Sequence, residues 1–389
     1  MNISIDSAWK SLNKHHEELC GDKVEILKTP DSDIVILTDG MGSGVKANIL
    51  ATMTAKILGT MMLEGESIEE AVETLASTLP VCSVRKMAYS TFSILQIFHH
   101  GEAYIVEFDN PACIFIREGK LLTIPFSERA IGEKTVREHR FRVKTNDCFI
   151  LMSDGTIYAG VGEILNFGWT WQSMADYALK CTKSTLSAAR LAALLSKACE
   201  DLYMERPGDD TTVAVARVIE RKIVNIFTGP PEKAENDEIL MRDFMNSSGK
   251  KVVCGGTSGQ IAARFLNVPI KSNMDNQGDI PPTAAIAGLD LVTEGILTLS
   301  KALALLKKYD SEEIEVAFFD ALDADNGAAK LARLIIEDCT ELNLFVGKAN
   351  NKAYYDHNGL FDINVRKNLV SQLYEIAQNL GKLVNIKYY

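Results

Sequence analysis

The 389-residue sequence lacks paired cysteines with metal-binding or redox spacing, and it lacks any long apolar run. Its eight cysteines are scattered, and none belongs to a Cys-x-x-Cys motif or to a cysteine–histidine cluster with zinc spacing. Isolated cysteines in a chain of this length are typical of a reduced cytoplasmic protein, so we expect that location. No apolar stretch reaches the ~18 residues of a membrane helix, and the N-terminus lacks the apolar core of a signal peptide.

Positive charge is also scarce. The chain has 41 lysines and arginines against 52 aspartates and glutamates, which gives a formal net charge of −11. Nucleic acids and anionic membranes are bound mainly through a surplus of lysine and arginine, so we expect neither partner. An acidic enzyme that acts on phosphate esters must obtain positive charge elsewhere, and bound metal ions are one source.

Length and pattern predict two domains, because a domain usually has about 100–200 residues. Hydrophobic residues make up 47% of the chain, enough for two ordinary cores. In residues 1–220 the order of elements predicts an α+β sandwich of two antiparallel sheets with helices outside. In residues 221–389 strands and helices alternate, which predicts an α/β domain with a mostly parallel sheet.

Periodicity and turn residues predict the individual elements. In the first part we expect strands at 33–38, 90–98, 103–108, 113–117, 120–124, 147–152 and 211–218, and helices at 45–63, 67–78 and 173–202. In the second part we expect strands at 223–227, 251–254, 342–346 and 383–387, and helices at 236–246, 260–266, 297–308, 328–338 and 365–380. Ser67 followed by Glu70 fits a capping box at the start of the second helix.

Acidic residues stand at strand ends in three places. Asp39 and Asp154 each follow an apolar strand, and Asp209 and Asp210 precede one. If the first two strands run opposite to the third, these acids gather at one edge of the sheets. Clustered carboxylates repel one another, and divalent cations relieve that repulsion. Oxygen ligands without histidine or cysteine suit Mg²⁺ or Mn²⁺ better than zinc, and the carbonyl of Gly40 could add a further oxygen.

Each of these motifs also has a simpler interpretation. Asp-Gly, at 39–40 and 154–155, is a common turn dipeptide, and the acidic pair at 209–210 is typical of a solvated loop. The glycine-rich segment 40–44 could open a helix as a phosphate loop, but it lacks the Lys-Ser/Thr ending of the Walker motif. The joint appearance of the motifs, each beside an apolar strand, favours a metal site.

These segments resemble the metal-dependent type 2C protein phosphatases (the PPM superfamily), and within them the bacterial SpoIIE-like branch. The matching segments are 38–46 (TDGMGSGVK), 151–155 (LMSDG) and 208–215 (GDDTTVAV), with weaker likenesses at 20–22 and 110–120. The resemblance implies an α-β-β-α sandwich. It also implies hydrolysis of phosphoserine or phosphothreonine by a water activated between two Mn²⁺ or Mg²⁺ ions, without a covalent enzyme intermediate.

The resemblance also implies roles for individual residues. Asp39 would bridge both metal ions, and Gly40 would give its carbonyl to one of them. Asp154 and Asp209 would hold one ion, Asp22 would hold the other through water, and Asp210 would support the site without binding metal directly.

No arginine that binds the substrate phosphate is evident. Arg85 and Lys86 are candidates, although a neighbouring basic pair of this kind is more typical of solvated surface.

A glycine-rich loop marks the second domain. Gly255, Gly256, Thr257, Ser258 and Gly259 follow a predicted strand and precede a predicted helix, so their backbone N–H groups could bind an anion. The loop has neither Rossmann nor Walker spacing, and a tight turn is the simpler interpretation. Loops are also expected at 292–295 and 320–327, at strand ends where open α/β sheets bind ligands. This domain could sense a small molecule or bind a partner.

Three functions are compatible with these patterns. The first is an active metal-dependent serine/threonine phosphatase that acts on a phosphorylated protein in bacterial signalling. The second is a catalytically silent phosphatase-like binding module. The third is an α/β domain that acts on or senses a phosphorylated metabolite, with the first domain regulating it. The intact acids favour the first, because a binding module has no use for clustered carboxylates.

Overall fold

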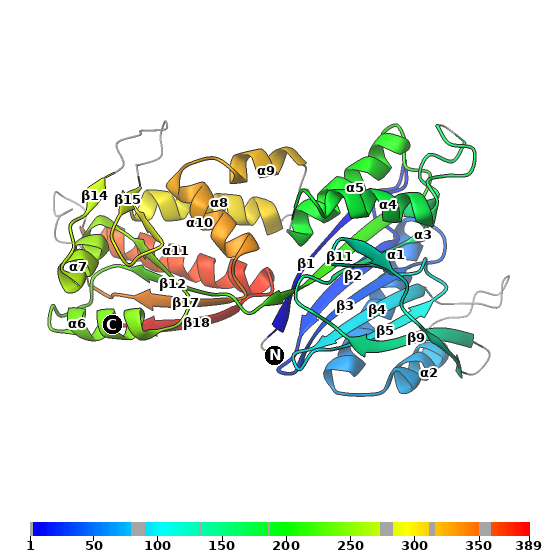
Figure 1. Ribbon diagram of the computed structural model, residues 1–389, viewed down its shortest axis with the longest axis horizontal. Coiled ribbons are helices and arrows are strands. Elements are labelled where there is room, and N and C mark those ends of the chain that lie inside the picture. Colours follow the sequence, from blue (N-terminus) through cyan, green and yellow to red (C-terminus); the bar gives the residue numbers. More distant parts are fainter. Residues whose placement is uncertain are drawn as a thin grey trace. The chain divides into compact units, whose positions relative to one another are not determined.

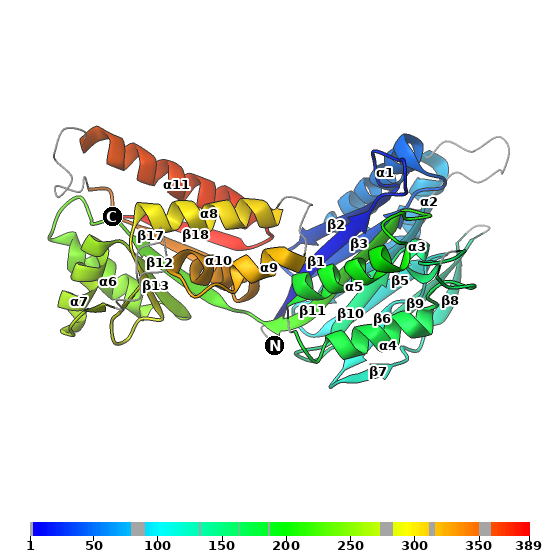
Figure 2. The same ribbon diagram turned by 90° about the horizontal axis from the view of Figure 1, so that it is seen from above.

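The computed structural model describes residues 3–78, 90–131, 134–162, 164–185, 187–272, 283–310, 316–349 and 359–389. The chain divides into two compact units, Met1–Glu220 and Arg221–Tyr389. Figure 1 labels the helices and strands of both units, and Figure 2 shows the same ribbon turned by 90°.

Two antiparallel sheets form the centre of the first unit. One has the order β1-β11-β10-β6-β7 and contains β1 (Ile3–Leu12), β6 (Ile114–Arg117), β7 (Lys120–Leu122), β10 (Cys148–Met152) and β11 (Thr211–Glu220). The other has the order β2-β3-β4-β5-β9-β8 and contains β2 (Asp22–Lys28), β3 (Ser32–Asp39), β4 (Thr91–Phe98), β5 (Glu102–Phe108), β8 (Ser127–Ile131) and β9 (Lys134–Arg142). The predicted α+β class with two antiparallel sheets is confirmed.

Helices cover the outer faces of both sheets. The helices of this unit are α1 (Gly44–Leu63), α2 (Ile68–Thr78), α3 (Asp154–Ile157), α4 (Trp171–Cys181) and α5 (Ala188–Leu202). One apolar core lies between the sheets, a second joins the β3 sheet to α1 and α2, and a third joins the β10 sheet to α4 and α5. The layers therefore follow the predicted α-β-β-α order.

Strand β3 is apolar at every central position because both of its faces are covered. Ile34 and Ile36 pack toward α1 and α2, whereas Val35 and Leu37 pack into the core between the sheets. None of these side chains is more than 1% exposed. Pairing with β2 on one side and β4 on the other sets the register of β3, and with it the position of Asp39 at its end.

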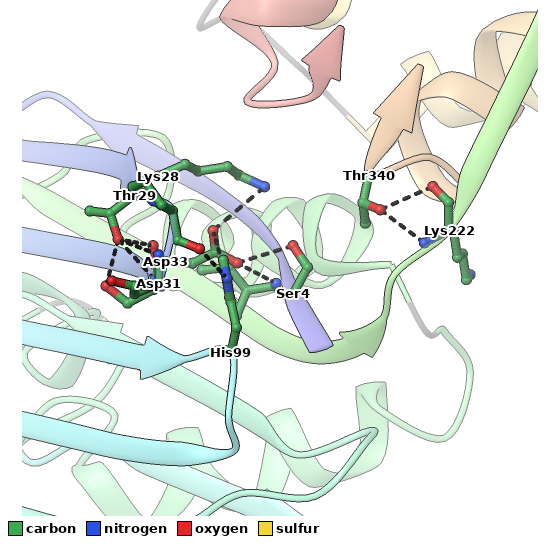
Figure 3. Close-up of polar contacts among 11 residues, drawn as sticks. Ser4, Lys28, Thr29, Asp31, Asp33, His99, Lys222 and Thr340 are labelled. Carbon is green, nitrogen blue, oxygen red and sulfur yellow. Dashed lines mark hydrogen bonds and ion pairs between the residues drawn. The ribbon is translucent and has the colours of Figure 1, made fainter. Parts of the chain in front are cut away.

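Both carboxylate oxygens of Asp33, at the start of β3, have polar partners (Figure 3). Its Oδ2 accepts hydrogen bonds from Ser4 Oγ at 3.0 Å and from the Ile5 amide at 2.9 Å, which ties the two sheets together. Its Oδ1 lies 3.9 Å from Lys28 Nζ and 3.8 Å from His99 Nε2. This carboxylate is 2% exposed, and its partners satisfy the charge that it buries.

The second unit contains a sheet of order β14-β15-β16-β13-β12-β17-β18. Its strands are β12 (Ile223–Thr228), β13 (Lys250–Cys254), β14 (Lys271–Ser272), β15 (Ala284–Ala285), β16 (Leu291–Thr293), β17 (Glu341–Val346) and β18 (Leu383–Tyr388). The five strands from β16 to β18 are parallel, and β14 and β15 add an antiparallel edge. The predicted mostly parallel sheet is confirmed.

The helices of the second unit are α6 (Asn236–Asn246), α7 (Gly256–Leu266), α8 (Ile296–Asp310), α9 (Val316–Leu322), α10 (Gly327–Glu337) and α11 (Gly359–Asn379). Helices α6 and α7 pack on Phe227, Val253 and Phe345 of the sheet. Figures 1 and 2 show α8, α10 and α11 over its other face.

Several sequence predictions are corrected by the structure. The single helix expected at 173–202 is two helices, because the chain turns after Cys181 and Ser187 caps α5 by accepting from the Arg190 amide at 3.4 Å. Helix α7 begins at Gly256 rather than at Gln260. Residues 320–322 lie in α9 and 291–293 in β16, so the loops expected there are shorter.

Some strands were not predicted from the sequence, whereas one predicted helix cap is present. Strands β1 and β2 were not expected, because their polar residues interrupt the apolar pattern. The Ser67–Glu70 capping box is confirmed by hydrogen bonds in both directions. Across the described ranges, no helix combines the length and the apolar character that a membrane crossing needs.

Candidate metal centre

The ends of two strand pairs bring the predicted acids to one place. Asp22 begins β2 and Asp39 ends β3, and the two residues are directly opposite in the antiparallel register. Asp154 follows β10 within two residues, and Asp209 and Asp210 stand immediately before β11, which pairs antiparallel with β10. The strand directions that the sequence required for a common edge are therefore present.

Burial and mutual repulsion raise the pKa values of Asp39 and Asp22. Burial raises the pKa of Asp39 to about 9, and the charges of Asp22, Asp154, Asp209 and Asp210 add to the rise. Burial likewise raises the pKa of Asp22 to about 7, although the neighbouring hydroxyls of Ser153 and Thr212 oppose the rise. Like charges directly opposite on paired strands are destabilising, so this arrangement calls for a counter-charge.

The pKa values of Asp154 and Asp210 are raised as well, in both cases mainly by burial. At Asp154 the charge of Asp209 adds to the rise, whereas hydrogen bonds with the Gly155 backbone and with Asp39 oppose it. The four raised pKa values have the same cause, namely carboxylates removed from water beside other carboxylates.

Three carboxylate oxygens in this cluster are orphaned. Both oxygens of Asp22 and Oδ2 of Asp210 are buried and have no hydrogen-bond partner of good geometry. Each residue is 4% exposed. A buried, unpartnered carboxylate is costly unless a cation balances it, and hard divalent ions bind oxygen ligands of this kind. The residues present therefore fit Mg²⁺ or Mn²⁺.

Within the described ranges, no group of three or more histidine, cysteine, aspartate or glutamate side chains is already arranged to hold a metal ion. The carboxylates thus share one edge of the sheets without forming a closed ligand cage. The ligand roles expected for Asp22, Asp39, Gly40, Asp154 and Asp209 stay predictions.

Glycines allow the acid-bearing segments to approach closely. A Cβ atom on Gly40 would collide with the backbone carbonyl of Ala47 in α1, and one on Gly155 would collide with the backbone of Asp210. A Cβ atom on Gly21 would lie 2.7 Å from Asp210 Oδ2. At these positions a larger residue would push apart the segments that gather the acids.

Two hydrogen bonds between Ser153 and Thr212 hold two of the acid-bearing segments together. The Ser153 amide donates to the Thr212 carbonyl at 3.0 Å, and the Thr212 amide donates to Ser153 Oγ at 2.8 Å. These bonds join the residue before Asp154 to the strand that follows Asp210.

Sequence reasoning missed a further segment, residues 13–19, in the connection between β1 and β2. Lys14 Nζ lies 3.6 Å from Asp209 Oδ1, and the Lys14 amide donates to Asp210 Oδ1 at 3.0 Å. Glu17 Oε1 accepts from Ser43 Oγ at 3.0 Å, in the loop after Asp39. No motif marks this segment, because its contacts are made across the fold rather than along the sequence.

The remaining predicted site residues are not among the described residues of the first unit. Arg85 and Lys86 fall outside the described residues. Gly255 precedes α7 with φ of +125°, and 256–259 form the first turn of that helix in the second unit. An anion site at this loop stays a prediction.

Known proteins are similar to the first unit in sequence. Residues 30–219 match the family model described as Stage II sporulation protein E (SpoIIE). Stage II sporulation protein E of Bacillus subtilis (strain 168) is 26% identical over 198 residues, which are 47% of this chain and 22% of that relative. The chain thus spans about a fifth of the curated relative that it matches.

Two solved structures are similar in outline. The phosphatase domain of SpoIIE from Bacillus subtilis, with a fragment of its regulatory domain, gives a TM-score of 0.47 at 21% identity and covers 57% of this chain and 64% of that chain. The RsbU and RsbW domains of a Mycobacterium tuberculosis protein give a TM-score of 0.47 at 16% identity and cover 62% and 67% of the respective chains.

The first unit is thus an α-β-β-α sandwich with acids at one edge, and residues 30–219 of it are similar to the SpoIIE family.

Proposed function

We propose that residues 1–220 form a metal-dependent phosphatase domain that removes phosphate from phosphoserine or phosphothreonine in a protein. The observation that supports it best is the orphaned state of the Asp22 and Asp210 oxygens, buried beside Asp39. Buried carboxylates without partners fit a site for cations, and an acidic chain needs cations to bind a phosphate ester. Scattered cysteines favour a cytoplasmic protein.

In this proposal the chain positions oxygen ligands around two Mn²⁺ or Mg²⁺ ions. Asp39, directly opposite Asp22, would bind both ions, and the partly exposed Asp209 would complete the site. Bound ions of this kind supply a water of lowered pKa and balance the charge of the phosphoryl group. Gly40 keeps α1 close to Asp39, which limits the movement of that carboxylate.

A chromogenic assay tests the proposal directly. The chelator-treated full chain is expected to hydrolyse p-nitrophenyl phosphate after addition of Mn²⁺, and Asp39→Asn is expected to lose at least about 100-fold in kcat/KM. Lys28→Met, at the far end of the β2/β3 pair, serves as the control. Absence of Mn²⁺-dependent turnover, or full turnover in Asp39→Asn, would rule out the enzyme and favour a silent binding module.

For residues 221–389 we propose a ligand-sensing or partner-binding domain. The parallel strands end in loops at Thr228, Cys254 and Thr293, and ligands of open α/β sheets bind at such ends. Thermal shift of the full chain with phosphorylated metabolites and nucleotides tests this role, and no shift of the second unit with any of them would contradict it.

A further inference from the structure

A lysine reaches the rim of the acidic cluster from the segment that joins β1 to β2. Lys14 Nζ lies 3.6 Å from Asp209 Oδ1, with 37% and 43% of the two side chains exposed. The charged groups that act most strongly on Asp39 are all carboxylates, so like charges gather at this edge of the sheets. The Lys14 ammonium group supplies a charge of opposite sign at its rim.

The position of this segment does not depend on the Lys14 ammonium group. The Lys14 amide donates to Asp210 Oδ1 at 3.0 Å, and the His15 amide donates to the Pro207 carbonyl at 2.8 Å. Further along, Glu17 is held by Ser43. A substitution of the Lys14 side chain therefore removes its charge and leaves these anchors in place.

The same carboxylate is accessible to solvent. Asp209 is partly exposed, whereas Asp22, the ligand proposed for the other ion, is buried. An ammonium group and a divalent cation are attracted to the same carboxylate oxygen, and close packing of both there is opposed by their like charges.

We infer that Lys14 is a built-in competitor of the divalent cation at Asp209. It neutralises this carboxylate in the metal-free protein and withdraws from it when the metal centre fills. Lys14 thereby lowers the metal affinity and keeps the empty site from being an unbalanced cluster of negative charge. The inference rests on the metal centre of the proposed function.

Isothermal titration of the chelator-treated full chain with MnCl₂ tests the competition without measuring catalysis. Lys14→Met keeps the length of the side chain and removes its charge, so it is expected to bind Mn²⁺ about threefold to tenfold more tightly than the wild type. Lys14→Arg keeps the charge and is expected to stay within about twofold of the wild type. Raising the salt from about 50 mM to 500 mM is expected to reduce the difference, because the pair is partly exposed.

A control pair exists in the same unit. Lys28 pairs with Asp33, at 3.9 Å, at the end of β3 opposite to Asp39 (Figure 3), although Asp33 is more deeply buried than Asp209. Lys28→Met is expected to leave the Mn²⁺ affinity unchanged, which separates local competition from the loss of one positive charge anywhere in the unit.

A double-mutant cycle decides whether the competition acts through Asp209. In an Asp209→Asn background, Lys14→Met is expected to have no effect on Mn²⁺ affinity, because the shared carboxylate charge is gone. Persistence of the full effect in that background would overturn the inference. So would unchanged or weaker Mn²⁺ binding by Lys14→Met in a wild-type protein that binds Mn²⁺. Failure of the wild type to bind Mn²⁺ would refute the proposed function as well.

Discussion

The hydroxyl of Tyr203 donates a hydrogen bond to the carbonyl of Gly155 at 2.7 Å. Tyr203 caps the C-terminal end of α5 and is 4% exposed, and Gly155 directly follows Asp154. The bond therefore joins a helix of the outer layer to α3, the short helix that begins with an acid of the candidate metal centre.

Tyr203→Phe removes this bond and leaves a buried carbonyl without its partner. The free energy of unfolding is expected to fall by about 1–3 kcal/mol, and calorimetry of the full chain in chelator can measure the change. Tyr388→Phe, at an exposed position in the second unit, is the control. An unaltered transition of the first unit in Tyr203→Phe would contradict the assignment of a structural role to this bond.

Asp33 and Asp39 lie at opposite ends of β3. Replacing each with asparagine is expected to change the stability of the metal-free protein in opposite directions. Asp39→Asn relieves repulsion with Asp22, so it is expected to raise the melting temperature of the metal-free protein and to abolish stabilisation by Mn²⁺. Asp33→Asn weakens charge-assisted bonds to Ser4 and Ile5, so it is expected to lower the unfolding free energy by about 1–3 kcal/mol. Equal shifts in one direction would contradict this contrast between the two ends.

Metal-free protein is expected to lose stability as the pH rises. The pKa of Asp22 is raised to about 7 and that of Asp39 to about 9, so the folded state holds protons that the unfolded state has released. The unfolded state then binds fewer protons, and the unfolding free energy falls with pH from the ordinary aspartate range up to about 9. Melting temperatures in chelator at pH 6, 7, 8 and 9 measure the slope, and Asp39→Asn should flatten it. A slope of opposite sign would refute the clustering of these acids.

Gly40→Ala places a Cβ atom against the backbone of Ala47, and backbone cannot move aside as a side chain can. We expect a loss of about 2 kcal/mol or more of stability and a weaker Mn²⁺ affinity, because α1 must move away from Asp39. Gly208→Ala is the matched control, since its Cβ atom would meet only ordinary contact with Tyr203 at 3.5 Å. Equal behaviour of the two variants in calorimetry and Mn²⁺ titration would show that close approach at Gly40 is unimportant.

Most of the helices and strands could be predicted from the amino-acid sequence. Continuous apolar runs such as 33–38 identify strands covered on both faces, and helical spacing identifies α1 and α6 within one or two residues. These signals are local, since burial on both faces requires apolar residues at each central position. The acids at 39, 154 and 209–210 were also recognisable, because each stands beside such a run.

The tertiary structure alone decided what surrounds those acids. Strand pairing sets Asp22 opposite Asp39, and the fold leaves their neighbour Asp210 with an unpartnered oxygen. It also brings Lys14 to Asp209 across 195 positions of sequence, since the segment before β2 packs on the loop before β11. Register and burial are properties of the assembled sheets, so no residue pattern along the chain could have revealed the charge balance of the site.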